Sequence, residues 1–154
     1  MSDASSPTDS TAFANAERGG FNETLGLRFV RVTADEVVAE VPVGPHLLQP
    51  YGLVHGGVHA SIVETLCSVG AAIHALPSGK TTVGLENSTS FLRATRGGTL
   101  TGRARPVHRG QRTEAWEVEI RDDAGELVAI GRVRMMLLDP GAALAGKRVE
   151  VETG

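Results

Sequence analysis

Apolar and polar positions alternate along much of this chain, which is the pattern of strands with one buried face. The clearest stretch is residues 114–121, where Trp116, Val118 and Ile120 are separated by charged or small side chains. Residues 122–125 (DDAG) supply a hairpin turn after it. Four further stretches are β-branched or alternate in the same way, and we expect strands in all of them: 36–43, 81–93, 99–107 and 127–138. Short turns between the strands predict an antiparallel sheet.

One segment has the period of a helix instead. In residues 57–75 the large apolar side chains recur at helical spacing and form one stripe: Ile62, Leu66, Val69 and Ile73. The segment ends at residues 76–79 (LPSG), which is a helix stop signal. The pattern therefore predicts an α+β fold in which a single long helix lies across one antiparallel sheet.

The two ends of the chain differ in composition from its middle. Residues 1–12 are rich in Ser, Thr, Asp and Pro, and residues 140–154 alternate small and charged side chains. We expect a disordered N-terminal tail at 1–12, one domain at 13–139 and a C-terminal tail at 140–154. The sequence of the middle part contains no internal repeat and no linker.

Composition and charge narrow the classes of partner. The formal net charge of −3 argues against a protein that binds nucleic acid through its phosphates. Apolar runs are shorter than the ~20 residues that cross a bilayer, so no membrane partner is expected. The N-terminus has no basic or apolar segment of a secretory signal, and we expect a cytoplasmic protein. The single cysteine, Cys67, excludes intrachain disulfides and has no evident base that would make it a nucleophile.

Glu64 is an unusual residue within the predicted helix. The helical period turns it away from the apolar stripe and places it among small side chains such as Ala60, Cys67 and Ala71. A carboxylate in such surroundings is costly to bury unless it is paired or protonated, which favours a functional role. The alternative is an ordinary glutamate on a solvated helix face.

The segment before the helix contains paired glycines, Gly56 and Gly57. Backbone N–H groups at the start of a helix can bind an anion, or the oxyanion that develops on an ester or thioester carbonyl. A plain loop whose glycines supply a positive φ explains the same residues. His55 precedes the glycines, but His59 and His74 lie far along the helix and no carboxylate stands at ligand spacing, so no metal is expected.

Residues 49–72 (QPYGLVHGGVHASIVETLCSVGAA) resemble the hotdog-fold acyl-CoA thioesterases, in the branch of the PaaI-type and 4-hydroxybenzoyl-CoA enzymes. That branch places a glutamate nine residues after the histidine of its His-Gly-Gly motif, as His55 and Glu64 stand here. Similar segments extend the resemblance to about residues 20–138: 83–84, the Asn87 strand, 107–110, 116–118 and 123–125. It implies a hotdog fold, in which one long central helix is wrapped by a curved antiparallel sheet of about five to six strands.

The resemblance implies roles for five residues around the start of the helix. Glu64 is implied as the catalytic carboxylate, either as nucleophile on the thioester carbonyl or as general base for water. The N–H of Gly56 is implied as the donor to the thioester oxygen, and His55 as the residue that holds this loop and the thioester. Gln49 is implied to align the carbonyl or the water. Ser68, one helical turn after Glu64, supplies a hydroxyl that contacts water or the acyl group.

The same resemblance implies a channel for coenzyme A. Its residues are Gly84, Phe91, Leu92, Arg93 and Ala94, followed by His108, Arg109, Gly110, Gln111, Arg112 and Thr113. Nine arginines stand against six acids between Arg93 and Arg134, and arginines bind phosphate groups bidentately. Arg93 and Arg112 are the expected phosphate ligands, whereas arginines on a solvated strand face explain most of the others.

We therefore expect an acyl-CoA thioesterase that needs no metal and no organic cofactor. It would hydrolyse an aromatic or medium-chain acyl-CoA, and the sequence does not distinguish the two. Related enzymes cover the open sheet edge by forming homo-oligomers, often dimers of dimers, and the same is expected here, with a tetramer favoured. Two alternatives use the same fold: a non-catalytic acyl-CoA sensor, which needs no carboxylate at position 64, and a hotdog hydratase, whose Asp/His pair is placed differently.

Overall fold

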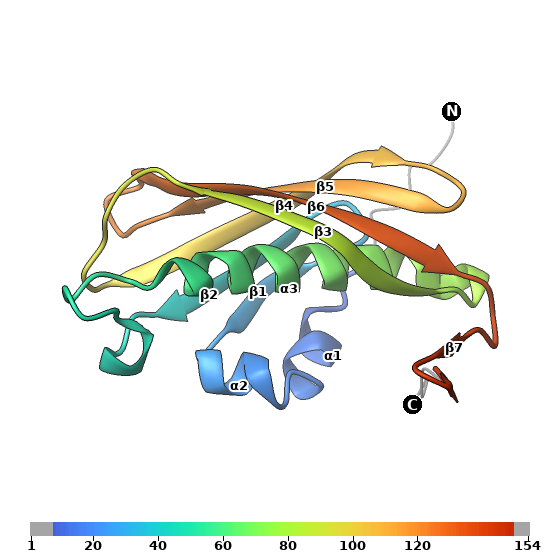
Figure 1. Cartoon of the computed structure of the whole chain (residues 1–154). Coiled ribbons are helices and arrows are strands. Elements are labelled where there is room, and N and C mark those ends of the chain that lie inside the picture. The colour runs from blue at the N-terminus through green and yellow to red at the C-terminus, as the bar shows by residue number, and fades with distance from the viewer. Residues whose placement is uncertain (1–7, 150–154) are drawn as a thin grey trace.

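The computed structural model of the chain describes residues 8–149, in which a long helix lies against one face of a six-stranded sheet (Figure 1). The helices are α1 (Thr11–Ala16), α2 (Phe21–Leu25) and α3 (Gly56–Ala75), with 3-10 turns η1 (Pro45–Leu47) and η2 (Leu76–Ser78). The strands of the sheet are β1 (Arg28–Val32), β2 (Val37–Pro42), β3 (Thr81–Phe91), β4 (Thr99–Arg109), β5 (Thr113–Arg121) and β6 (Leu127–Leu138). A short ribbon of β7 (Ala143–Leu144) and β8 (Lys147–Arg148) follows.

The sheet is antiparallel, with the strand order β1-β2-β4-β5-β6-β3. On β5 the apolar side chains Trp116, Val118 and Ile120 are buried and the alternate positions are more exposed, as their spacing predicted. The turn before β6 is closed by a hydrogen bond from Gly125 N to Asp122 O at 2.9 Å. The fold class and the strand number expected from the sequence are confirmed. Among the described strands β3 pairs with β6 alone and forms one edge of the sheet (Figure 1).

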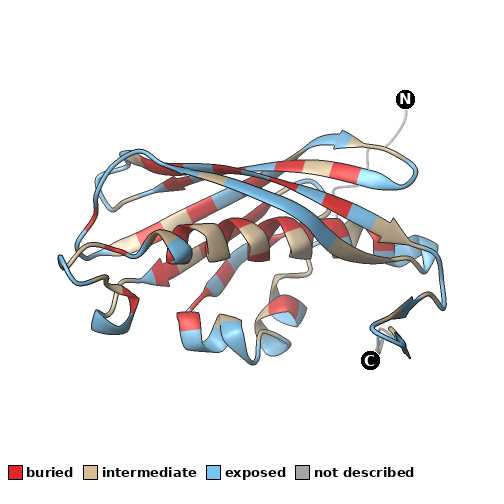
Figure 2. Ribbon diagram, in the orientation of Figure 1, coloured by how far each residue is buried: buried red, intermediate tan, exposed pale blue. Residues whose placement is uncertain are grey.

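Helix α3 packs closely against the sheet because glycines stand at the contacts. A Cβ on Gly102 of β4 would lie 2.8 Å from Ile62, and a Cβ on Gly70 of the helix would lie 2.5 Å from the Trp116 ring. Buried side chains extend beyond the predicted stripe, since Val58 and Val63 are buried as well. Figure 2 shows buried positions along much of the helix. By length and apolar composition alone, Gly56–Ser78 could cross a membrane, a property shared by helices that form a protein core.

The N-terminal region is more ordered than its composition suggested. Ser10 N donates to Val32 O at 2.8 Å, and Val32 N donates to the Thr11 hydroxyl at 2.8 Å, so residues within the predicted tail extend the contacts of β1. Helix α2 then reaches α3, where the Thr65 hydroxyl donates to Asn22 Oδ1 at 2.8 Å. Neither β1 nor these two short helices was expected from the pattern, because each is too short to show a period. Residues 1–7 of the predicted tail lie outside the described residues.

The predicted C-terminal tail also begins with regular structure. Strands β7 and β8 form a two-stranded hairpin. Residues 150–154 lie outside the described residues. The division of the chain at 12 and 139 stays a prediction.

Candidate active site

Glu64 lies in the third turn of α3 and faces β3, the edge strand. Its Oε2 accepts a hydrogen bond of 3.0 Å from Asn87 Nδ2, and its Oε1 lies 3.5 Å from the Ser68 hydroxyl. Asn87 is itself fixed, because its Nδ2 also donates to Ala60 O at 3.0 Å and its Oδ1 accepts from the Thr89 hydroxyl at 2.7 Å. The carboxylate is therefore held in one orientation by neutral partners, none of which is a cation that would neutralise it.

Gly84 leaves the space that this carboxylate occupies. A Cβ at position 84 would lie 2.5 Å from Glu64 Oε1. The resemblance assigned Gly84 to the coenzyme A channel, and the geometry places it directly against the carboxylate. Asn87 was noted only as part of a similar strand, and its contact with Glu64 joins residues 23 positions apart in the chain.

The start of α3 is organised by His55. This residue is the N-cap, and its Nδ1 accepts a hydrogen bond of 2.9 Å from Gly57 N, so its Nε2 carries the proton of a neutral ring. Within residues 8–149 no acceptor meets the N–H of Gly56, the first residue of the helix. That N–H lies at the positive end of the helix dipole and can donate to a ligand.

Two contacts fix the loop that leads into the helix. The Gln49 side-chain oxygen accepts a hydrogen bond from Tyr51 N, which leaves the amide nitrogen of Gln49 as a donor. Arg96, from the connection between β3 and β4, donates to Tyr51 O at 2.8 Å and to Gly52 O at 3.4 Å. Arg96 thus positions this loop, a role that its type and spacing did not indicate.

A cavity of about 300 Å³ opens beside the start of α3. Gln49 and Gly56 line it on one side, and Phe91 lies so close that a Cβ on Gly56 would be 2.7 Å from the ring. The cavity is completed by residues from the loop, from α3 and from the β3–β4 connection: Leu53, Val54, His59, Leu92, Arg93, Ala94 and Thr95. The structure therefore brings residues 91–94, expected in the coenzyme A channel, together with Gln49 and Gly56.

Gly56 and Glu64 lie apart on the same helix. Eight residues separate them, which corresponds to about 12 Å along the helix axis. A thioester carbon must lie within about 3.5 Å of an attacking group, so one carbonyl cannot contact both residues of one chain. The candidate site residues of one chain thus form two separate groups, one at the helix start and one at the helix middle.

The second expected channel segment, residues 108–113, is distant from the cavity. In the sheet register Thr113 pairs with Met136, near the beginning of β3, whereas Phe91 pairs with Ala129 at the other end of β6. Arg109 of this segment serves the fold: it bonds Asp35 at 2.8 Å, and its guanidinium lies 5.4 Å from the centre of the Trp116 ring. Within one chain these residues do not meet residues 91–94.

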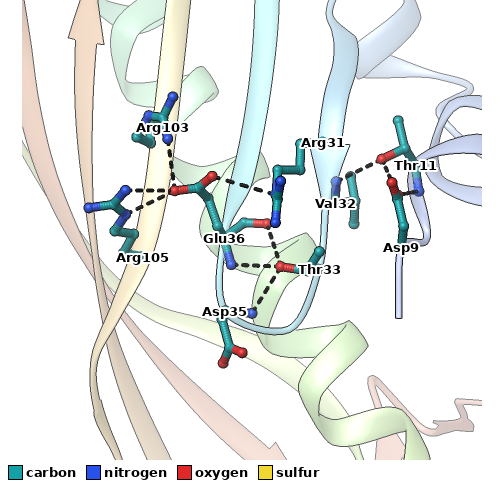
Figure 3. Close-up of polar contacts among 9 residues, drawn as sticks. All are labelled: Asp9, Thr11, Arg31, Val32, Thr33, Asp35, Glu36, Arg103 and Arg105. Atoms are coloured by element: carbon teal, nitrogen blue, oxygen red, sulfur yellow. Dashed lines mark hydrogen bonds and ion pairs between the residues drawn. The ribbon is translucent and has the colours of Figure 1, made fainter. Parts of the chain in front are cut away.

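Most of the arginines in this half of the chain are paired with acids. Seven of the nine form ion pairs: Arg93, Arg103, Arg105, Arg109, Arg121, Arg132 and Arg134. The largest cluster surrounds Glu36, just before β2, which pairs with Arg31 of β1 and with Arg103 and Arg105 of β4 (Figure 3). Burial raises the pKa of Glu36, but hydrogen bonds from Arg105 and Arg103 outweigh it, so the pKa lies below its ordinary value. Six of these seven arginines lie on strands of the sheet, and Arg93 follows β3; which of them bind phosphate stays a prediction.

Other nucleophile and metal chemistry has little support in the described residues. Cys67 is fully buried, and burial together with the nearby Glu64 charge raises the pKa of its thiol far above the ordinary value. Residues 8–149 contain no group of three His, Cys, Asp or Glu side chains able to hold a metal ion.

Comparison with known proteins assigns the family. The model of the thioesterase superfamily matches residues 51–129, which include α3 and most of the sheet. The solved structure of Rv1847 from Mycobacterium tuberculosis has a TM-score of 0.76 and 39% identity, and the match covers 80% of this chain and 98% of that one.

Two curated relatives have names that state an activity. The 1,4-dihydroxy-2-naphthoyl-CoA hydrolase of Listeria monocytogenes is 34% identical over 113 residues, 73% of this chain and 91% of that protein. The proofreading thioesterase EntH of Cronobacter sakazakii is 35% identical over 120 residues, 78% of this chain and 87% of that protein. The chain therefore belongs to the thioesterase superfamily, has the hotdog fold and is a thioesterase.

Proposed function

We propose that this thioesterase hydrolyses an aromatic or medium-chain acyl-CoA to the free acid and CoA. Glu64 attacks the thioester carbonyl or activates a water molecule, and the N–H of Gly56 donates to the developing oxyanion. Gln49 aligns the carbonyl or the water, and His55 holds the loop that presents Gly56. Ser68 supports Glu64 from one turn further along the helix. The name of the Listeria relative, a hydrolase of an aromatic acyl-CoA, supports this substrate class.

The observation that carries the proposal is the fixed orientation of Glu64. Its two oxygens contact Asn87 and Ser68, and the absent side chain of Gly84 leaves the space beside it. A surface glutamate with no function needs neither an amide held by two further hydrogen bonds nor a glycine opposite it. The carboxylate is oriented by neutral partners, and a nucleophile or general base requires such positioning.

We further propose that a complete site forms between two copies of the chain. Because about 12 Å separates Gly56 from Glu64 on one helix, the two act on one thioester only if they come from different copies. β3 offers the surface: it is an edge strand whose residues 84–88 are exposed (Figure 2). Antiparallel pairing of two β3 strands reverses one helix relative to the other, and the start of one α3 then meets the middle of the second.

The same arrangement accounts for the separated channel segments. In an antiparallel pair, the end of β3 in one copy lies beside the beginning of β3 in the second copy. Residues 91–94 of one copy then approach residues 108–113 of the second, where Arg93 and Arg112 can bind the phosphates of coenzyme A. We propose a homo-oligomer built from this dimer, with a dimer of dimers as the expected assembly and the cytoplasm as its location.

A panel of aromatic and medium-chain acyl-CoA esters tests the proposed function through release of free thiol. Glu64→Gln retains the size and hydrogen bonding of the side chain, so we expect an unchanged fold and a kcat lower by at least ~10²-fold. Glu23→Gln, an exposed glutamate of α2, is the matched control and should retain full activity. A Glu64→Gln protein with more than about a tenth of natural activity on its best substrate would exclude the assignment.

A further inference from the structure

Two buried polar atoms without hydrogen-bond partners belong to residues that line the cavity beside Gly56. In the part of the chain that the structure describes, three buried side-chain polar atoms lack a partner: His59 Nδ1, Thr95 Oγ1 and Arg109 Nε. His59 is 3% exposed and Thr95 is 8% exposed, and both side chains line the cavity. Neither has a role in the chemistry proposed above. Two of the three unpaired atoms therefore belong to side chains that line one cavity, just beneath its surface.

These two atoms reduce the stability of the protein without a ligand. A buried polar group left without a hydrogen bond destabilises a fold, and here two different elements each supply one. His59 comes from the second turn of α3, and Thr95 comes from the connection between β3 and β4. Cavities that retain unpaired polar groups in this way are typical of binding sites, where the ligand supplies the missing partner.

The surroundings indicate the chemical class of that partner. Burial lowers the pKa of His59, so its imidazole is neutral. A neutral imidazole and a threonine hydroxyl both offer a donor and an acceptor, but neither offers charge. The ring of Phe91 lies 5.9 Å from the His59 ring, and Leu53 and Leu92 add further apolar wall. The cavity suits a neutral hydroxyl or amide that is carried on an apolar or aromatic body.

We infer that His59 and Thr95 determine specificity, by selecting thioesters that place a neutral hydroxyl or amide group in this cavity. The inference rests on the proposed function to the extent that the ligand is a thioester whose carbonyl meets Gly56. Two parts of such a ligand carry the required chemistry. The group is either a hydroxyl of the acyl part or an amide of the thiol part.

Two pairs of substrates distinguish these sources. The first pair is 4-hydroxybenzoyl-CoA and benzoyl-CoA, which differ only in an acyl hydroxyl. The second pair is the benzoyl thioesters of N-acetylcysteamine and of 1-pentanethiol, which differ by one amide. The variants are Thr95→Val, which removes the hydroxyl at nearly constant volume, and His59→Leu. Thr82→Val, at the far end of β3, is the matched control.

In at least one pair we expect the natural protein to prefer the polar member by ~10-fold or more in kcat/KM, because a site built for a hydrogen bond rejects the analogue that lacks it. Each variant should reduce that preference below about 3-fold and leave hydrolysis of the apolar member within about 2-fold. The melting temperature of each variant without ligand should equal or exceed that of the natural protein. The pair that responds identifies the source of the polar group.

Equal losses on both members of each pair, or a preference that both variants retain, would overturn the inference and leave the proposed function intact. If the natural protein cleaves none of the four thioesters, the proposed function fails on these substrates. The same compounds then act as uncleaved ligands in a thermal-shift assay. A melting-temperature rise that is the same for both members of each pair, and the same in the variants, overturns the inference in that case as well.

Discussion

Replacing Gly56 with proline isolates the contribution of one backbone N–H to catalysis. The N–H is the only donor that Gly56 has, so no side-chain truncation can remove it. Proline is favoured at the first position of a helix, where its missing N–H has no partner to lose. His55 has φ −62° and ψ 136°, the extended conformation that a residue before proline requires. We therefore expect the proline variant to fold with α3 intact.

The magnitude follows from comparison with Gly56→Ala. Any side chain at position 56 brings a Cβ to 2.7 Å from the Phe91 ring, so the ring must shift in both variants. Alanine keeps the N–H, so the difference between the two variants reports the loss of the donor together with the bulk that the proline ring adds at the nitrogen. Loss of one oxyanion donor typically lowers kcat by ~10²–10³-fold, and we expect a difference of this size between alanine and proline.

The assay is thiol release from the best acyl-CoA, with circular dichroism and size-exclusion chromatography to establish fold and assembly. Alanine should be moderately less active than the natural protein, because the displaced Phe91 ring forms part of the cavity wall. A folded proline variant as active as the alanine variant would refute the role of this N–H. The amide of Gln49, which also lines the cavity, would then be the next candidate donor.

Three further predictions concern the phosphates and the fold. Arg93→Ala and Arg112→Ala should raise KM for acyl-CoA at nearly constant kcat. On acyl-pantetheine thioesters, which lack the nucleotide, both variants should match the natural protein. Equal defects on both substrates would show that these arginines are structural. Because the pKa of Glu36 is lowered, its contribution to stability is complete above the ordinary value of 4.5 and is lost as pH falls through the pKa of the folded protein. In urea unfolding across that window, the free energy of unfolding of Glu36→Gln should depend less on pH. An unchanged pH dependence would contradict the argument. The fully buried Glu114 carboxylate lies 2.5 Å from His74 Nδ1 and accepts a hydrogen bond of 2.8 Å from Trp116 Nε1. His74→Ala should therefore lower the free energy of unfolding by about 3 kcal/mol. A loss under about 1 kcal/mol in urea titrations would show that the pair contributes little.

The fold was predictable where one element carries enough residues to show its period. On β5 apolar and charged side chains alternate from Trp116 to Arg121, and on α3 the apolar stripe repeats from Ile62 to Ile73, over about three turns. β1, with five residues, and the N-terminal helices, with six and five, offer no such pattern. Their places depend on tertiary contacts such as the hydrogen bond from Thr65 to Asn22, which joins residues 43 positions apart.

The candidate site divides in a similar way. Glu64 and Gly56 could be proposed from the sequence because local surroundings, small neighbours in one case and a helix start in the other, mark them. The supporting residues could not, since Asn87 meets Glu64 and Thr95 meets the cavity only after β3 crosses the helix. The separation of Gly56 from Glu64 also follows from helix geometry, but its meaning for assembly depends on β3 being an open edge.

Complementation between two inactive variants tests most directly whether Glu64 and Gly56 act together across two copies. Glu64→Gln and Gly56→Pro chains, each expected to be inactive alone, are coexpressed with different affinity tags so that mixed oligomers can be isolated. Each mixed dimer then contains one site with both residues intact. We expect a one-to-one random mixture to recover about a quarter of natural activity, because half of the dimers are mixed and each holds one intact site of two. Purified mixed oligomers that stay as inactive as either parent would contradict the account.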